Sequence, residues 1–236
     1  MRLYVIRHAD PDYPNNTLTN AGRQEAQALA RRLASHGLDA LYASPLPRAQ
    51  MTAQYCADLL KLPITTLDWL MEPAWFDYDI DPADGERMPV WDTPGEILRS
   101  NPAFHTWETW SSTAPLTDAK YAMDYRTFVA GADVLVAAHG YVREDRRYRI
   151  ESANQKRIAC FCHNGSALLW LALLLHIPPP LVWSGFWHAP SAVSTYQFEE
   201  RSREWAVPRA LSIADVSHLY EARLPVQPRG IRGNHA

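Results

Sequence analysis

Five residues of this 236-residue chain combine positive charge, titratable nitrogen and carboxylate chemistry at points where apolar segments end. They are Arg7, His8, Arg48, Glu72 and His163. If one crevice collects them, the arginines can hold the oxygens of an anion and an imidazole can present a nitrogen nucleophile. The carboxyl group can protonate a leaving group and afterwards activate water. This set of groups suits phosphoryl transfer through a phosphohistidine, without a metal ion.

The segments around these residues predict a layered sheet. Runs typical of buried strands occupy residues 2–6, 38–43, 64–67 and 158–162, and helix-type patterns lie between them. Such alternation indicates a mostly parallel sheet covered by helices. Open sheets of this kind form their ligand sites at the carboxyl ends of the strands. Each of the five residues follows one of the four strands, so we expect them to share that edge.

The helices expected next to this edge have clear end signals. Thr19 is a suitable N-cap for a helix that ends at His36-Gly37, with glycine in the left-handed position. A second helix follows Ser44-Pro45-Leu46-Pro47. Arg48 then lies in its first turn, where free backbone N–H groups favour an anion. Further helices are expected at residues 118–138 and 166–176, and late strands, which could pair antiparallel, at 194–199 and 204–207.

Residues from about 73 to 117 interrupt the alternation. Four tryptophans, several prolines and an acidic patch occur there without a sustained period; the patch comprises Asp77, Asp79, Asp81, Asp84 and Glu86. We interpret this stretch as an insertion that folds over the strand ends, in which the tryptophans mainly pack and the acids form a solvated face. The tail, residues 225–236, is rich in Pro, Gly and Arg and is expected to be flexible. Residues 1–224 are then one domain.

The composition of the chain indicates which binding partners and which cellular location to expect. The net charge of −3 gives no reason to expect a nucleic acid. No apolar stretch reaches membrane-spanning length and no signal-type leader is visible, so we expect a cytoplasmic protein without a membrane partner. Three cysteines make no disulfide framework. In a strand, Cys160 and Cys162 would face away from His163, so we expect no metal and no other cofactor. The oligomeric state stays open.

Three segments of the chain resemble the histidine phosphatase superfamily, the phosphoglycerate mutase-like group, in its first branch. They are Leu3-Tyr4-Val5-Ile6-Arg7-His8-Ala9, Leu18-Thr19-Asn20-Ala21-Gly22-Arg23-Gln24-Glu25-Ala26 and Tyr42-Ala43-Ser44-Pro45-Leu46-Pro47-Arg48-Ala49 with Thr52-Ala53. The resemblance covers residues 3–60 and resumes near Glu72 and over residues 158–198. It implies a three-layer α/β/α sandwich around a mainly parallel sheet. The insertion, which the resemblance does not cover, is expected to form a subdomain over the site.

The resemblance also implies roles for the five residues. His8 would be the phosphorylated nucleophile, and Arg7 and Arg48 would hold the phosphoryl oxygens. His163 would be a further donor to those oxygens. Glu72 would donate the proton and then serve as the base for water. The implied activity is metal-independent hydrolysis of a phosphomonoester, on a small phosphorylated metabolite.

The chain departs from the family pattern in three places. Ala9 replaces the usual glycine after the nucleophile, which fits unless the backbone there needs a positive φ. His163-Asn164-Gly165 replaces the usual His-Gly. The loop between His8 and Leu18 is short, so the polar side chain that the family often sends into the pocket would have to come from Asn15 or Asn16.

Several alternatives compete with this interpretation. Val134 to Gly140 also reads as an apolar strand ending in His139-Gly140, but the charged residues that follow lack a crossover helix, so we favour His163. Asp68 and Asp77 compete with Glu72 as the acid. A mutase is a second possible activity, although Pro73-Ala74-Trp75-Phe76 replaces the Arg-His-Tyr-Gly of glycolytic mutases. A third possibility is a phosphate-binding protein without turnover, because fold alone does not guarantee chemistry.

Overall fold

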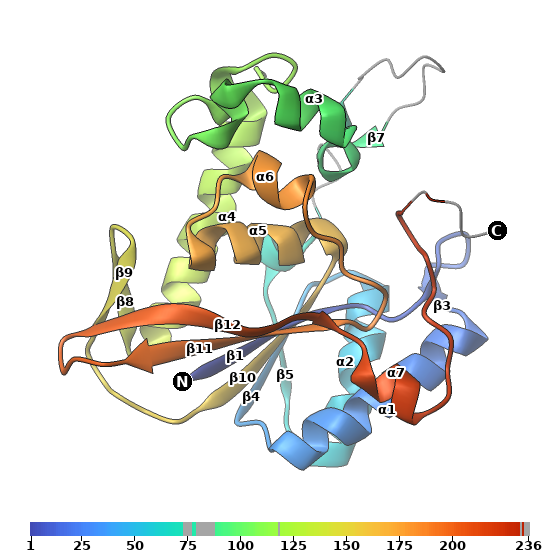
Figure 1. The fold of residues 1–236 in the computed structure, drawn as a ribbon. Coiled ribbons are helices and arrows are strands. Elements are labelled where there is room, and N and C mark those ends of the chain that lie inside the picture. The colour runs from blue at the N-terminus through green and yellow to red at the C-terminus, as the bar shows by residue number, and fades with distance from the viewer. Residues whose placement is uncertain (73–76, 79–87, 118, 232, 234–236) are drawn as a thin grey trace.

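A computed structural model describes residues 1–72, 77–78, 88–117, 119–231 and 233 (Figure 1). Its centre is an eight-stranded sheet with the order β5-β4-β10-β1-β11-β12-β9-β8. Four neighbouring strands are parallel: β5 (Ile64–Thr66), β4 (Ala40–Ala43), β10 (Arg157–Cys162) and β1 (Arg2–Arg7). Their carboxyl ends therefore meet at one edge, as the strand pattern predicted.

The other half of the sheet is built from antiparallel pairs. Its strands are β11 (Val193–Glu200), β12 (Trp205–Asp215), β9 (Arg147–Ile150) and β8 (Tyr141–Glu144). The antiparallel pairing expected for the two late strands is confirmed, although β12 extends well beyond the predicted end. Two short pairs lie outside the sheet: β2 (Pro11–Asp12) with β3 (Thr17–Leu18), and β6 (Asp77–Tyr78) with β7 (Met88–Pro89).

Helices cover both faces of the sheet (Figure 1). One face carries α1 (Asn20–His36), α2 (Pro47–Leu60) and α7 (Ser217–Glu221), and the other carries α4 (Ala119–Ala138), α5 (Asn164–Leu175) and α6 (Pro179–Trp183). Side chains along β1 point alternately to the two faces of the sheet, so the strand contributes to the core on each face. Leu3 and Val5 enter the core beneath α5, whereas Tyr4 and Ile6 enter the core beneath α1 and α2. The expected three-layer α/β/α sandwich is confirmed.

The start of α1 shows why this part of the sequence folds as expected. The Thr19 hydroxyl accepts a hydrogen bond from Gly22 N at 2.9 Å, and Gly37 ends the helix with φ 69°. Gly22 has to be glycine, because a Cβ there would collide with the carbonyl oxygen of Asp10. The helix can therefore pack closely on the chain that leaves β1.

The described part of the stretch between β5 and α4 forms short elements, most of which pack on α4 or α6. They are η1 (Asp68–Leu70), β6, β7, η2 (Val90–Asp92), α3 (Gly95–Ser100), η3 (Pro102–His105) and η4 (Trp110–Ser112). Packing is mainly aromatic: Trp110 meets Trp183 with ring centroids 5.8 Å apart, and Trp107 stacks on His176 at 4.8 Å. The packing role predicted for Trp91, Trp107 and Trp110 is confirmed. Trp75 and the side chains of the acidic patch lie outside the described residues.

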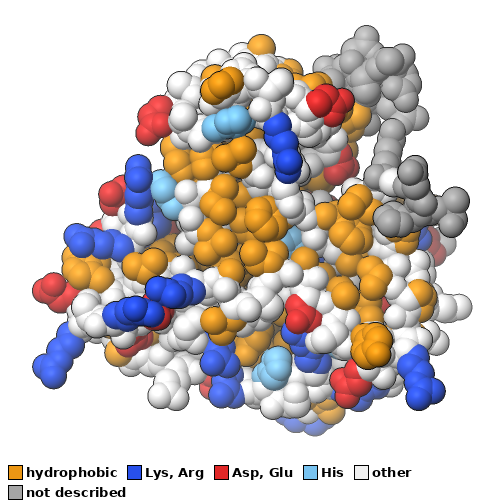
Figure 2. Space-filling view, viewed as in Figure 1, with side chains coloured by type: hydrophobic (Ala, Val, Ile, Leu, Met, Phe, Trp, Pro, Cys, Tyr) orange, Lys and Arg blue, Asp and Glu red, His pale blue; other side chains and the backbone are white. Residues whose placement is uncertain are grey.

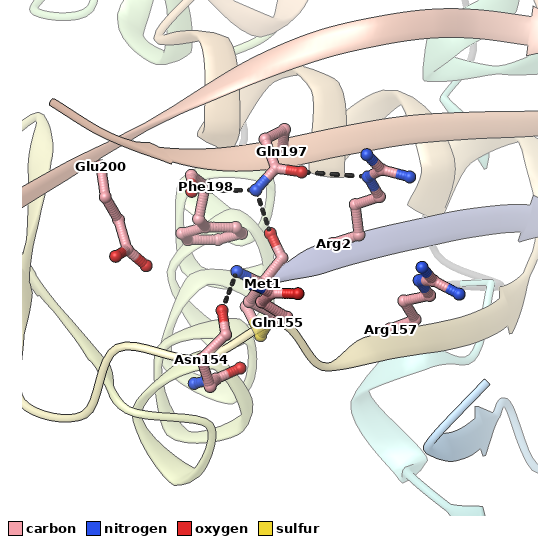
Figure 3. Close-up of a pocket in the computed structure, with 8 residues that line it drawn as sticks. All are labelled: Met1, Arg2, Asn154, Gln155, Arg157, Gln197, Phe198 and Glu200. Atoms are coloured by element: carbon pink, nitrogen blue, oxygen red, sulfur yellow. Dashed lines mark hydrogen bonds between the residues drawn. The ribbon is translucent and has the colours of Figure 1, made fainter. Parts of the chain in front are cut away.

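The amino-terminal ends of β1 and β10, opposite the site edge, border a hollow of about 310 Å³ (Figure 3). Met1, Arg2 and Arg157 line it, together with polar groups of the neighbouring strands. The histidines that follow β1 and β10 belong to the other edge, so this hollow has no part in their chemistry. Among the described residues, no helix combines the length and apolar character needed to cross a bilayer.

Candidate active site

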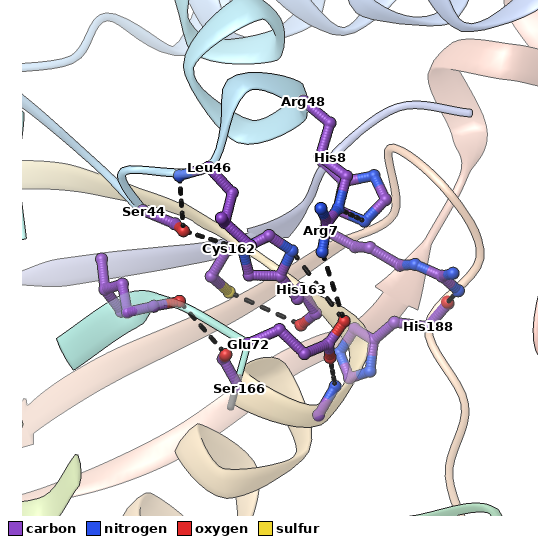
Figure 4. A network of polar contacts seen from close by, with 12 residues as sticks. Arg7, His8, Ser44, Leu46, Arg48, Glu72, Cys162, His163, Ser166 and His188 are labelled. Carbon is purple, nitrogen blue, oxygen red and sulfur yellow. Dashed lines mark hydrogen bonds and ion pairs between the residues drawn. The ribbon is translucent and has the colours of Figure 1, made fainter. Parts of the chain in front are cut away.

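His8 and His163 lie side by side at the carboxyl edge of the sheet (Figure 4). Each follows the last residue of its strand, β1 or β10, and the two strands pair with Arg7 opposite Cys162. The backbone N–H of His8 donates to the carbonyl of Cys162 at 2.9 Å. As a result the two imidazole centroids are 5.1 Å apart, with the ring planes at 60°.

The contacts of the His8 ring define its tautomer. Nδ1 lies 2.8 Å from the carbonyl oxygen of Ala9, which can only accept, so Nδ1 carries the proton. Nε2 consequently has a lone pair, and it accepts from Nε of Arg48 at 3.1 Å. Burial, and then the charges of Arg7 and Arg48, hold the pKa of His8 well below its ordinary value. The ring is therefore neutral and presents Nε2 toward the cations.

Ala9 and Thr52 connect β1 to the first turn of α2. Ala9 is not among the residues with positive φ, so replacement of the usual glycine introduces no backbone strain. Its N–H donates to the Thr52 hydroxyl at 3.0 Å, and that hydroxyl donates to the carbonyl of Arg48 at 2.7 Å. This bridge holds the nucleophile loop and Arg48 in a common position.

Arg7 is buried, and its Nη1 donates to two backbone carbonyls. These belong to His188, at 2.6 Å, and to Arg229 in the tail, at 3.0 Å. His188 is a core histidine: burial lowers its pKa to about 3, and its Nε2 lies 2.7 Å from the Ser194 hydroxyl. Its backbone nevertheless orients Arg7. Arg48 is held from outside by the Tyr13 ring, whose centroid lies 5.5 Å from the guanidinium carbon.

His163 is oriented by Ser44, which follows β4. The Ser44 hydroxyl accepts from Leu46 N at 3.3 Å and lies 2.8 Å from Nε2 of His163. Because the Leu46 N–H already bonds a lone pair of the Ser44 oxygen, the Ser44 hydroxyl can donate its proton to Nε2 of His163. Nδ1 of His163 is then the protonated nitrogen. Nδ1 is buried and has no hydrogen-bond partner among the described residues. Burial, helped by the nearby His8 and arginines, holds the pKa of His163 well below its ordinary value. A neutral ring thus has one N–H available for an anion.

Glu72 approaches the histidines from the segment after η1. Its Oε1 accepts from the backbone N–H of Gly165 at 2.7 Å, while Oε2 lies 3.9 Å from His163 Nδ1 and 3.8 Å from Arg48 Nη2. Burial raises the pKa of the Glu72 carboxyl, although the Gly165 N–H and the charges of Arg7 and Arg48 oppose this. The balance favours a carboxyl group that keeps its proton at higher pH than an exposed one.

The unusual His163-Asn164-Gly165 sequence forms the start of α5. Gly165 accommodates both Glu72 and Trp91, because a Cβ there would meet the indole ring and come 3.0 Å from Oε1 of Glu72. The inserted Asn164 accepts from the backbone N–H of His188 at 3.1 Å through its side-chain oxygen. The extra residue therefore ties α5 to the segment that orients Arg7.

Other residues considered from the sequence lie elsewhere. His139 follows α4, not a strand, and its Nε2 is 2.9 Å from the Tyr42 hydroxyl. Asp68 is exposed, and the side chain of Asp77 lies outside the described residues. The suggestion that Asn15 or Asn16 supplies a pocket group is wrong: both are exposed, and Asn15 bonds Asp12 at 2.9 Å. The residue of this loop that reaches the site is Tyr13, whose ring lies against the Arg48 guanidinium.

An ion pair that sequence reasoning missed joins the tail to the site. Nε of Arg229 donates to Asp10 Oδ1 at 2.7 Å, although the two residues are 219 positions apart. The Thr19 hydroxyl donates to the other oxygen of Asp10 at 2.7 Å. No local pattern could reveal this contact. Flexibility of the tail as a whole, and the domain boundary at residue 224, remain predictions.

A cavity of about 920 Å³ lies near the site and is lined in part by Trp91, whose ring also lies against Gly165, the residue that bonds Glu72. It reaches Asn164 at the start of α5 and is bounded by η2 and α3, by α6 with the chain that follows, and by Gly230 and Ile231 of the tail. Hydrophobic side chains gather on the face of the molecule shown in Figure 2. Within the described residues, His, Cys, Asp and Glu side chains form no group of three that could hold a metal ion.

Comparison with known proteins identifies a curated relative, a family and solved structures with the same fold. Putative phosphoserine phosphatase 2 of Hydrogenobacter thermophilus is 31% identical over 87 residues, which is 33% of this chain and 43% of that protein. The match thus spans less than half of the length of this curated relative. Solved structures with the same fold include a phosphoserine phosphatase of Entamoeba histolytica in complex with phosphoserine, with TM-score 0.59, 18% identity and coverage of 92% of this chain and 98% of that one.

A second solved structure with this fold is a mycobacterial glucosyl-3-phosphoglycerate phosphatase in complex with inorganic phosphate. It has TM-score 0.61 and 19% identity, over 92% of this chain and 98% of that one. The model of the histidine phosphatase superfamily (branch 1) matches residues 3–209, which include all five site residues. The chain belongs to the histidine phosphatase superfamily, branch 1.

Proposed function

We propose that this protein hydrolyses a phosphomonoester of a small metabolite through a phosphohistidine at His8. The arrangement at His8 is the observation that supports this most directly. Its proton is committed to the Ala9 carbonyl, and its basic Nε2 faces Arg48, beside Arg7 and His163. A neutral imidazole among fixed donors is the form that can attack phosphorus.

In the first step, Nε2 of His8 forms a bond to phosphorus while the bond from phosphorus to the leaving oxygen breaks. Arg7, Arg48 and Nδ1 of His163 would donate to the phosphoryl oxygens, where negative charge is concentrated. The substrate replaces the hydrogen bond between Arg48 and His8, so that the guanidinium turns from the nucleophile to the phosphate. Protonated Glu72 gives its proton to the leaving oxygen, and an alcohol departs.

In the second step, the Glu72 carboxylate takes a proton from water as the water oxygen attacks phosphorus. The N–P bond breaks, inorganic phosphate leaves, and both His8 and Glu72 return to their starting forms. The fixed cations and the His163 N–H supply the charge stabilisation, so the proposal requires no metal ion and no cofactor.

Replacing His8 tests this function. With p-nitrophenyl phosphate, we expect His8→Ala to lose at least about a thousandfold in kcat, because the other imidazole of the site, His163, offers an N–H and not a lone pair to the phosphate. Acid-labile, base-stable phosphate should appear on wild-type protein quenched during turnover and be missing from the variant. His139→Ala is the matched control, since that ring lies outside the site. Undiminished turnover in the His8 variant would contradict the proposal.

We also propose a cytoplasmic location and a small phosphorylated molecule, not a nucleic acid or a membrane, as the partner. The three cysteines are free, buried thiols, which suits a reducing compartment. The net charge of −3 supplies no attraction for nucleic acid.

A further inference from the structure

The loop that joins β2 to β3 brings one aromatic side chain to the arginines of the site. This side chain belongs to Tyr13, whose ring lies under the guanidinium group of Arg48, with the guanidinium carbon 5.5 Å from the ring centroid. Tyr13 is 55% exposed, so burial in the core does not determine its position. The contact with the cation and the fold of its own loop do so instead.

The hairpin that carries Tyr13 is fixed to the helix that carries Arg48. Pairing of β2 with β3 closes the hairpin, and its turn contains Asn16, which has φ 51° and donates its N–H to the Tyr13 carbonyl at 3.2 Å. From β3, the Thr17 hydroxyl donates to the sulfur of Met51 on α2 at 3.3 Å. The loop therefore has a defined place beside the first turn of α2.

The hydroxyl end of Tyr13 lies near two further arginines. Burial lowers the pKa of Arg7, and this is opposed first by the charge of Glu72 and then by the Tyr13 phenol. The phenol also acts on Arg229, whose pKa is raised mainly by its hydrogen bond to Asp10. The tail that carries Arg229 runs beside β3 (Figure 1). Arginines from three separate segments thus surround one tyrosine.

A hydroxyl among arginines has a proton that the arginines cannot accept. Guanidinium groups only donate, so they can use the lone pairs of the phenol oxygen but not its O–H. Two other donors of the site, Nε of Arg7 and Nδ1 of His163, are buried without a hydrogen-bond partner among the described residues. The site therefore has an excess of donors. A bound phosphate supplies the acceptors that these groups lack.

We propose that Tyr13 is a phosphate-binding residue: its ring supports Arg48, while its hydroxyl donates to a phosphoryl oxygen that Arg7 and Arg48 also hold. The inference rests on the phosphate-binding step of the proposed function and adds a residue to the same site. Tyr13 then does what the sequence suggested for Asn15 or Asn16, which is to send a polar group from this short loop into the pocket. A neutral hydroxyl adds a donor without adding charge.

Tyr13→Phe separates the hydroxyl from the ring, and calorimetric titration with inorganic phosphate measures binding without any need for turnover. We expect the Kd for phosphate to rise about tenfold, the loss of one hydrogen bond to a charged group. Tyr13→Ala should weaken binding by about a further threefold, because Arg48 also loses the ring. With p-nitrophenyl phosphate, the KM of Tyr13→Phe should rise in parallel with little change in kcat, because the bond is made before and during the reaction.

Tyr220→Phe is the matched control, because it removes the hydroxyl of a tyrosine that is 89% exposed on α7, and it should keep the wild-type Kd. Circular dichroism should show that all three variants are folded. Wild-type Kd and KM in Tyr13→Phe would overturn the assignment, even if Tyr13→Ala binds more weakly, since only the ring would then matter.

The two measurements separate this inference from the function on which it rests. Turnover that depends on His8, together with an unchanged Kd in Tyr13→Phe, would leave the hydrolase proposal intact and overturn the role of Tyr13. Phosphate binding that weakens in Tyr13→Phe, in a protein that cleaves no ester, would overturn the hydrolase proposal and support the role of Tyr13. A wild-type protein that neither binds phosphate nor cleaves an ester would overturn both.

Discussion

At the scale of single residues, the site depends on neutral imidazoles held among fixed cations. His8 and His163 are both buried, and burial is the first cause of their lowered pKa values. Since a protonated imidazole cannot attack phosphorus, this keeps the nucleophile competent at acid pH. The same burial acts in the opposite direction on Glu72, whose pKa it raises. One environment thus produces a deprotonated base and a protonated acid.

Glu72→Gln separates the acid role from a merely structural one. We expect kcat/KM for an alkyl phosphate to fall by about 10²- to 10⁴-fold, because the poor leaving group needs the proton. For p-nitrophenyl phosphate the loss should be far smaller, since nitrophenolate departs without protonation. In the wild type, kcat/KM for the alkyl ester should decrease as pH rises through the raised pKa of Glu72. Equal losses on both substrates would mean that Glu72 is not the acid.

Glu25 predicts a pH dependence of stability. Its carboxyl accepts from Asp10 N at 2.9 Å, and burial raises its pKa from 4.5 to about 7. The folded state therefore binds this proton more tightly than the unfolded state, and the free energy of unfolding declines as pH rises from about 4.5 through 7. Glu25→Gln should remove about 1–3 kcal/mol of that decline.

Urea unfolding of both proteins at about pH 5 and pH 8 measures this effect. The wild type should lose more stability between the two conditions than the variant does. Glu221→Gln, which changes an exposed acid on α7, serves as the control and should keep the wild-type slope. A Glu25→Gln protein with that same slope would show that Glu25 is not the responsible group.

At the scale of elements, the start of α5 sets the geometry of the acid. Gly165 brings a backbone N–H to Glu72 and leaves room for Trp91, while Ser166 donates to the carbonyl of Leu70 at 3.2 Å. Two contacts thus hold the segment after β5 against the helix that follows β10. The position of the general acid is a property of this junction.

Gly165→Ala tests the junction. The added methyl group must displace the indole or the carboxyl group, so kcat/KM for an alkyl phosphate should fall by about tenfold or more. Gly95→Ala is the matched control, because a Cβ there has its nearest neighbour at 3.9 Å. Circular dichroism should confirm that both variants are folded. Full activity in the Gly165 variant would show that the acid does not depend on this close approach.

At the scale of the whole molecule, the site is closed by parts of the chain that are far apart in sequence. The tail returns to the strand ends, where the Arg229 carbonyl accepts from Arg7 and also from Trp187 Nε1, the latter at 3.1 Å. Its side chain pairs with Asp10, whose side chain is 3% exposed. Tail, nucleophile loop and cavity wall therefore support one another.

Arg229→Ala should weaken this closure without removing a group that contacts the reacting atoms. We expect KM to rise about three- to tenfold with a smaller change in kcat, and the free energy of unfolding to fall by about 1 kcal/mol, because Asp10 loses its charged donor. Steady-state kinetics and urea unfolding measure the two effects. Arg203→Ala, at an exposed position, should change neither. Unchanged KM and stability in Arg229→Ala would show that the tail contact is incidental.

The sequence by itself determined the parts of this protein that follow from local pattern. Strand and helix periodicity, the Thr19 cap and the strand-end rule located Arg7, His8, Arg48 and His163 on one edge. The same rule rejected His139, because its surroundings lack the strand–helix crossover. These features depend on residues within a few turns of one another, so a linear reading can detect them.

Only the tertiary structure decided how these groups are oriented and what surrounds them. The Ser44–His163 and Gly165–Glu72 contacts, and the Asp10–Arg229 pair, join separate segments and leave no periodic trace. The cavity near the site likewise assembles its wall from η2, α6 and the chain after α6. Side-chain contacts between distant segments arise from packing, which sets the neighbours of each group and therefore its pKa and its reach.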